Sequence, residues 1–166
     1  RKGVDFLSGY CAVKPAPADI VITTNGGYPL DQNAYQCPKG MSAAEATVND
    51  GGVIIMLATC QDGHGGESYY HSIADAESAD AFFQQCLHTP QVETLPDQWF
   101  AQIWCRIVRK YKVLFVADKA QEQLIRDLKV EYFETLDEAY ARARELKGPD
   151  ATLTCIPNGV SVVVKD

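Results

Sequence analysis

The fold is decided by a short run near the start of the chain, Ala18-Asp19-Ile20-Val21-Ile22-Thr23-Thr24, which stops at Asn25-Gly26-Gly27. Its residues are mostly β-branched and apolar, and the glycines that follow indicate a turn, so this run predicts a buried strand. A second run of the same kind spans residues 53–59, and shorter ones span 113–116 and 130–133. Strands that are continuously apolar, rather than alternating, are typical of a parallel sheet covered on both faces.

Helical patterns fill the intervals between these strands. Apolar residues recur at helical spacing over residues 79–87 and 99–111. Ser42 with Glu45 and Thr135 with Glu138 fit the capping-box pattern, and Asp118 is placed to cap a further helix.

Strands that alternate with helices predict an α/β domain with an open, mostly parallel, Rossmann-like sheet and helices on both faces. The last two apolar stretches, residues 151–156 and 160–165, flank Pro157-Asn158-Gly159 and predict a C-terminal β-hairpin.

The boundary of this domain is expected near residue 18. Residues 1–17 end in Lys14-Pro15-Ala16-Pro17 and predict a connecting arm, which leaves residues 18–166 as the α/β domain. The chain starts at Arg1, and its first methionine is Met41. We therefore interpret it as a carboxy-terminal piece of a longer polypeptide.

Charge and composition exclude several classes of partner. The net charge of −7 argues against nucleic-acid binding, which needs a basic face. No apolar run approaches the roughly 18 residues of a membrane span, so no membrane partner is expected. Six cysteines without a C-x-x-C pair, mostly within apolar patterns, favour buried thiols in a reducing compartment, and hence the cytoplasm. The histidines have no ligand spacing either, and no metal site is predicted.

In open α/β sheets, ligands bind beyond the carboxyl ends of the strands. Three segments should meet at that edge: residues 25–40 after the first strand, residues 61–67 after the second, and the first turn of the helix near Gln98, which carries Trp99.

The first of these segments has the spacing of a carboxylate receptor. If Asp31 caps a short helix, Gln36 and Lys39 lie three residues apart on one face, and Tyr35 lies four residues before Lys39. An ammonium beside an amide and a phenol can bind a small carboxylate, with about 1.5–3 kcal/mol for each sheltered charge-assisted hydrogen bond. The alternative is a solvated lysine and a core tyrosine.

Three stretches resemble the nickel-dependent lactate racemase family. They are Ile22 to Asn33, the pattern Tyr35-Gln36-x-x-Lys39-Gly40-Met41, and Asp62-Gly63-His64-Gly65-Gly66-Glu67. The resemblance implies that this chain is the C-terminal domain of such a protein. The missing N-terminal domain would then bind most of the nickel-pincer nucleotide, tether it to a lysine and carry the catalytic histidines.

The resemblance also implies a reaction. A histidine removes the hydroxyl proton of a 2-hydroxy acid while the hydride passes to the cofactor, and the flat 2-keto acid takes the hydride back on either face. Gln36 and Lys39 match the family's substrate-holding positions and are the expected catalytic residues of this chain. Tyr35 would lie beside them, and Trp99 would form part of the substrate pocket.

Three features complicate this expectation. Pro38 lies between Gln36 and Lys39, and a proline kink there could rotate Lys39 and change the preferred substrate. The Gly63–Gly66 loop could hold a phosphate, with His64 contacting the cofactor, or could be a tight turn that needs glycines. Trp99 also fits the apolar face of its helix and could be a core residue.

Two functions from different classes follow. The first is the substrate-binding domain of a 2-hydroxyacid racemase or epimerase, inactive as an isolated fragment. The alternative is a non-catalytic nucleotide- or small-acid-binding α/β domain. A histidine pair and a cofactor-tethering lysine in the upstream sequence would favour the enzyme.

Overall fold

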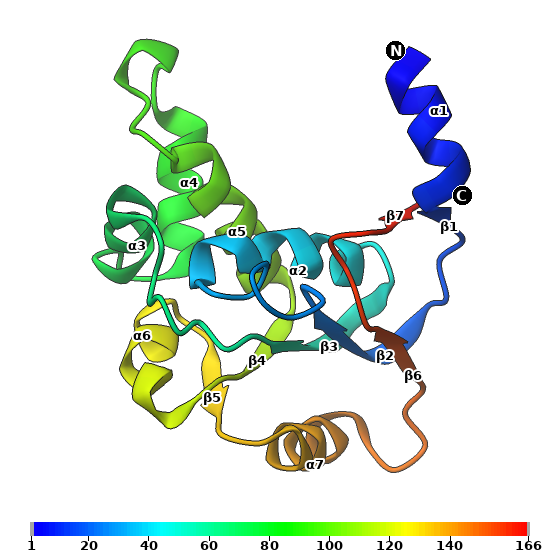
Figure 1. The fold of residues 1–166 in the computed structure, drawn as a ribbon. Helices are drawn as coiled ribbons and strands as arrows, with labels where there is room; N and C mark the ends of the chain where they lie inside the picture. Colours follow the sequence, from blue (N-terminus) through cyan, green and yellow to red (C-terminus); the bar gives the residue numbers. More distant parts are fainter. Residues whose placement is uncertain (1, 166) are drawn as a thin grey trace.

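Five strands form one parallel sheet in the computed structural model, which describes residues 2–165 (Figure 1). The strand order is β5-β4-β3-β2-β6, and every neighbouring pair is parallel. The expectation of an open, mostly parallel sheet is therefore confirmed. The strands are β2 (Ala18–Thr24), β3 (Val48–Leu57), β4 (Lys112–Val116), β5 (Glu131–Phe133) and β6 (Leu153–Ile156).

The central strand, β3, explains why the apolar runs are continuous. Its Ile55 lies beside Ile22 of β2 on one side and Leu114 of β4 on the other. Residues 53–56 are all buried, so successive side chains that point to opposite faces of the sheet are both shielded from water. Helices must therefore cover the two faces.

A group of helices covers one face, and a single helix covers the other (Figure 1). The larger buried cluster includes Trp104 of α5 and Ile125 of α6, and the smaller one joins Ala139 and Ala143 of α7 to Ile55 on the opposite face. The helices around the larger cluster are α2 (Cys37–Glu45), α3 (Glu67–Ala74), α4 (Ala79–His88), α5 (Gln98–Lys110) and α6 (Glu122–Asp127), and α7 spans Leu136–Lys147.

Of the three helix caps predicted from the sequence, the structure contains one. Thr135 forms the expected capping box with Glu138 at the start of α7. The capping box at Ser42 is wrong, because Ser42 lies inside α2 and its hydroxyl donates to the carbonyl of Pro38 at 2.7 Å. Asp118 precedes a short 3₁₀ turn, η3 (Lys119–Gln121), and accepts no capping hydrogen bond through its side chain.

The predicted C-terminal hairpin is wrong. Strand β6 adds to the edge of the main sheet, parallel to β2, whereas β7 (Val163–Val164) pairs in parallel with β1 (Ala12–Val13) in a separate two-stranded sheet. The segment between them turns at residues 157–160, but this turn packs against the end of β2 instead of joining two paired strands, since the N–H of Gly159 donates to the carbonyl of Thr24 at 2.9 Å. The edge of β2 thus obtains backbone partners that a local hairpin would leave unpaired.

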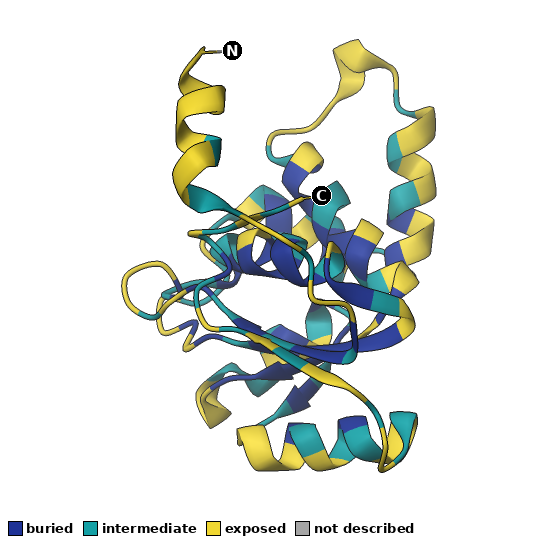
Figure 2. Cartoon of the chain, turned by 90° about the vertical axis from the view of Figure 1, so that its right-hand side faces the viewer, coloured by how far each residue is buried: buried dark blue, intermediate teal, exposed yellow. Residues whose placement is uncertain are grey.

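The expected arm contains a helix. Helix α1 (Lys2–Cys11) has no buried residue and projects away from the sheet (Figures 1 and 2). The outer limits of the expected arm and domain, Arg1 and Asp166, lie outside the described residues. Among residues 2–165, no helix combines the length and apolar character that crossing a membrane requires.

The six cysteines are free thiols, but their burial differs more than the sequence indicated. Three are buried, two are partly buried and Cys155 is exposed on β6. The buried ones are Cys37, Cys60 and Cys105.

Candidate functional site

The site begins at Asn25, the residue directly after β2. Its side chain is fully buried, and its Nδ2 atom donates to the carbonyls of Leu30 at 2.8 Å and Gln36 at 2.9 Å. Its Oδ1 atom accepts from the N–H of Gly40 at 3.1 Å. A Cβ atom at Gly40 would lie 2.5 Å from this Oδ1 atom, so only glycine fits there. Asn25 therefore holds both ends of the segment that carries the candidate substrate residues.

Gln36 and Lys39 converge as predicted. Gln36 ends a short 3₁₀ helix, η1 (Ala34–Gln36), and Lys39 lies in the first turn of α2. The ammonium of Lys39 donates to Oε1 of Gln36 at 2.5 Å. No carboxylate among residues 2–165 forms an ion pair with Lys39, so its charge is available to an anion.

Pro38 does not turn Lys39 aside. The proline occupies the second position of α2, where the backbone N–H groups have no partner within the helix. Its missing N–H therefore costs no helical hydrogen bond, and the two side chains meet across it. Gln36 is partly buried and Lys39 is exposed.

The expected capping role of Asp31 is wrong. Asn33 precedes η1 without a side-chain capping bond, and Oδ2 of Asp31 instead accepts from the N–H of Thr59 at 3.3 Å. The backbone carbonyl of Asp31 accepts from the N–H of Cys60 at 3.0 Å. Asp31 thus ties the loop after β2 to the end of β3.

Tyr35 does not join the Gln36–Lys39 pair through its hydroxyl. Its ring packs against Tyr69 and Phe100, with ring centroids 5.3 and 4.7 Å apart. Its hydroxyl donates to Oδ1 of Asp97 at 3.0 Å. Burial raises the pKa of Tyr35, and the bond to Asp97 raises it further, so the hydroxyl remains protonated at neutral pH.

Trp99 lies at the expected edge and is not a core residue. It occupies the first turn of α5, whose chain continues into β4, and 59% of its surface is exposed. The buried face of the helix is formed by its neighbours, among them Phe100 and Trp104. Asp97, the partner of Tyr35, lies two residues before Trp99.

The glycine loop after β3 packs against the segment that leads to Gln36. The carbonyls of Gly63 and His64 accept from the N–H groups of Ala34 and Tyr35, both at 3.0 Å. Gly63 and Gly65 have φ values of 71° and 75°, as the tight-turn alternative predicts. The three segments thus meet at one edge of the sheet.

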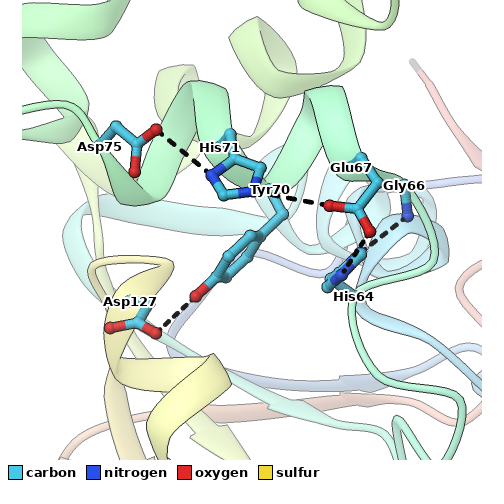
Figure 3. A network of polar contacts seen from close by, with 7 residues as sticks. All are labelled: His64, Gly66, Glu67, Tyr70, His71, Asp75 and Asp127. Atoms are coloured by element: carbon cyan, nitrogen blue, oxygen red, sulfur yellow. Dashed lines mark hydrogen bonds and ion pairs between the residues drawn. The ribbon is translucent and has the colours of Figure 1, made fainter.

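His64 is held within a polar network (Figure 3). Its Nδ1 atom accepts from the N–H of Gly66 at 3.2 Å, which in the neutral ring places the proton on Nε2, 3.7 Å from Glu67. Its ring stacks on Tyr70 at 5.0 Å. The Tyr70 hydroxyl donates to Asp127 at 2.6 Å, and this bond, with burial, raises the pKa of Tyr70 to about 12.

A crevice of about 310 Å³ lies at the carboxyl ends of β2, β3 and β4. Gln36 is partly buried, Lys39 and Trp99 are exposed, and none of the three lines it. Three carboxylates do, namely Asp31, Asp118 and Glu134. Their charge disfavours a phosphate in the crevice.

Comparison with known proteins identifies the family. A family model described as the lactate racemase C-terminal domain matches residues 13–164. The chain belongs to this lactate racemase C-terminal domain family.

Curated relatives agree with this assignment. The chain is 48% identical over 165 residues to a lactate racemase of Lactiplantibacillus plantarum, and 45% identical over 165 residues to one of Thermoanaerobacterium thermosaccharolyticum. Each match covers 99% of this chain and 39% of the relative, so the chain spans about two fifths of their length.

A solved structure shares the fold. The lactate racemase apoprotein from Thermoanaerobacterium thermosaccharolyticum superposes with a TM-score of 0.95 at 45% identity, over 99% of this chain and 40% of that chain.

The donor set of this lactate racemase C-terminal domain does not fit nickel. Within the described residues, no group of three or more histidine, cysteine, aspartate or glutamate side chains could hold a metal ion. His64 and His71 both approach Glu67, at 3.7 and 3.5 Å, but through separate carboxylate oxygens. We therefore assign no nickel ligand to residues 2–165.

The sequence does not single out two residues of the site. The pattern at Asn25 indicates only a turn, because its three bonds depend on how the loop folds back. Asp97 stands directly before a helix, where an aspartate indicates a cap. Its actual partner, Tyr35, is 62 residues away in the sequence.

Proposed function

We propose that this chain is the substrate-binding domain of a longer parent protein, an isomerase that racemises or epimerises a small 2-hydroxy acid of the lactate type. The observation that carries this proposal is the Lys39–Gln36 pair, held at 2.5 Å at the carboxyl edge of the sheet. Membership of the lactate racemase C-terminal domain family supports it.

The pair is suited to a carboxylate. The ammonium of Lys39 directs one N–H to Oε1 of Gln36, which leaves its other N–H groups and the amide NH₂ of Gln36 as donors. Two donors of this kind, one of them charged, can hold the two oxygens of a carboxylate. The substrate then keeps its position while the configuration at C2 is inverted.

Trp99 has a complementary role in the proposal. Its exposed indole supplies an apolar wall at the same edge, which would exclude water from the substrate. The hydroxyl of Tyr35 is engaged by Asp97, so Tyr35 supports the backbone before Gln36 rather than touching the acid directly.

The proposed cofactor is a nickel-pincer nucleotide, bound mainly by the part of the parent outside this chain. The chemistry that it supplies when bound is reversible acceptance of the C2 hydride. From this chain we propose one cofactor contact, the Nε2–H of His64, whose proton position is set by the bond from Gly66.

The second candidate is a non-catalytic domain that binds a nucleotide or a small acid. The acidic lining of the crevice disfavours nucleotide phosphates there. A small acid without catalysis would use the same Lys39–Gln36 pair, and only an activity measurement separates it from the enzyme.

The test is a racemisation assay on the full-length parent purified from the cytoplasm, its proposed location. D-lactate should be converted to a mixture with L-lactate by the parent, and not by the 166-residue chain alone. A parent that binds lactate and converts neither isomer would favour the non-catalytic alternative. Racemisation by the isolated chain would refute the division of labour between domains.

A further inference from the structure

We propose that Asp97 is a positioning residue that fixes Tyr35 and thereby sets the place of Gln36 relative to Trp99. This role rests on the function proposed above, because it assumes that Gln36 and Trp99 contact the substrate.

The backbone of Asp97 is the first indication. Its φ and ψ values of 59° and 2° place it in the left-handed region, which aspartate adopts less readily than glycine. An aspartate directly before a helix ordinarily caps it through its side chain. Asp97 makes no such bond. A strained residue that forgoes its usual local partner points to a constraint imposed from elsewhere in the fold.

That constraint is the hydroxyl of Tyr35, which donates to Oδ1 of Asp97 at 3.0 Å. The Tyr35 ring is packed between Tyr69 and Phe100, and its backbone N–H donates to the carbonyl of His64. Tyr35 is thus fixed at its backbone, its ring and its hydroxyl. The raised pKa of Tyr35 keeps this hydroxyl a donor throughout the neutral range.

Asp97 also determines where α5 begins. Its backbone carbonyl accepts from the N–H groups of Phe100 at 2.9 Å and Ala101 at 3.1 Å. Gln36 directly follows Tyr35, and Trp99 lies two residues beyond Asp97. Asp97 therefore joins the two segments that carry the proposed substrate contacts. A shift of Asp97 would displace the segment of Gln36 relative to that of Trp99.

Three substitutions in the full-length parent isolate this contact. Tyr35→Phe removes only the hydroxyl. Asp97→Gly removes the carboxylate and relieves the left-handed backbone, so any loss is due to the missing bond and not to strain. Asp97→Asn keeps an acceptor oxygen and tolerates the left-handed conformation. The control is Tyr140→Phe, which removes a tyrosine hydroxyl bonded to Arg144 on the opposite face of the sheet.

The expected result is a change in kcat rather than in KM, because Lys39 still anchors the carboxylate while the acid is held less accurately. Tyr35→Phe and Asp97→Gly should each lower kcat for lactate about tenfold, with KM within about threefold of wild type. The double variant should be no worse than either single variant, since both remove one interaction. Asp97→Asn should restore kcat to within about threefold, and Tyr140→Phe should change it less than about twofold.

Two results would overturn the positioning role in an active parent. One is an effect of Tyr35→Phe and Asp97→Gly no larger than that of Tyr140→Phe. The other is full additivity in the double variant, which would mean that the two residues do not act through a shared bond. A wild-type parent that racemises no 2-hydroxy acid would instead overturn the proposed function, and this role with it.

Discussion

The side chain of Asn25 donates a 2.9 Å hydrogen bond to the backbone carbonyl of Gln36, although the two residues are eleven positions apart in the sequence. The same side chain accepts from the N–H of Gly40 at 3.1 Å. Asn25, which directly follows β2, therefore holds residues 36–40 at both ends. The position of Lys39 depends on these two hydrogen bonds.

Replacing Asn25 with alanine should destabilise the domain and disorder the candidate site. Three backbone groups, one buried and two partly buried, would lose their partner, so the free energy of unfolding should fall by about 2–4 kcal/mol. Asn49→Ala is the matched control, because it removes one partly buried bond, to Asp19, and should cost only about 1 kcal/mol. Urea unfolding measures the loss in each variant. Equal losses would contradict the role of Asn25 in holding residues 36–40.

The glycine loop offers a second matched pair. Gly63 and Gly65 have similar left-handed φ values, but a Cβ atom at Gly65 would lie 2.3 Å from Cγ of Asn33, whereas one at Gly63 meets nothing within 4 Å. Gly63→Ala should cost about 1 kcal/mol of stability from backbone strain alone. Gly65→Ala should cost more and should also lower activity, because it pushes the segment that leads to Gln36. Indistinguishable unfolding curves and kinetics for the two variants would show that the loop does not support this segment.

The two tryptophans should respond in opposite ways. Trp104 is fully buried, and its Nε1–H donates to the carbonyl of Leu128 at 2.9 Å. Trp104→Ala should therefore lower the free energy of unfolding by about 3–5 kcal/mol. Trp99→Ala should change stability by less than about 0.5 kcal/mol. In the parent, Trp99→Ala should nevertheless raise KM for lactate, and an unchanged KM and kcat would remove Trp99 from the site.

Acid stability should depend on Asp19, at the amino end of β2. Hydrogen bonds from Asn49 and from the side chain and backbone of Thr152 lower its pKa from 3.8 to about 2. Because the folded-state pKa is the lower one, the stabilisation is present above pH 3.8 and is lost as the pH falls through about 2. The stability difference between wild type and Asp19→Asn, followed by urea unfolding from about pH 5 to pH 2, should shrink with acid. A difference that stays constant over this range would exclude the ionised carboxylate as its source.

The strands could be predicted because burial on two faces leaves a direct mark on the sequence. Residues 53–56 are all apolar because helices cover both sides of β3. The C-terminal hairpin was mispredicted because a local pattern does not reveal a distant partner. Leu153 of β6 pairs with Ile20, far back in the chain, and the turn at Gly159 is bonded to Thr24.

The candidate site was predictable where its residues are close in sequence. Gln36 and Lys39 are three residues apart, and their convergence needs only helical geometry that Pro38 permits from its place in the first turn. The position of Tyr35 was not predictable in the same way. Its hydroxyl is directed by Asp97, and that contact exists only after α5 has packed on the sheet.

Lys39 is the residue on which the proposed site depends most. The most direct test compares kcat/KM for lactate racemisation in the full-length parent and in its Lys39→Ala and Lys165→Ala variants. Lys165 is an exposed residue after β7. Within the described residues, only its backbone N–H forms a hydrogen bond, to the carbonyl of Val13. Loss of one charge-assisted contact of about 2–3 kcal/mol should lower kcat/KM of Lys39→Ala roughly 30- to 150-fold. Lys165→Ala should remain within about twofold of wild type. Equal effects of the two substitutions would contradict the assignment of Lys39 to the substrate carboxylate.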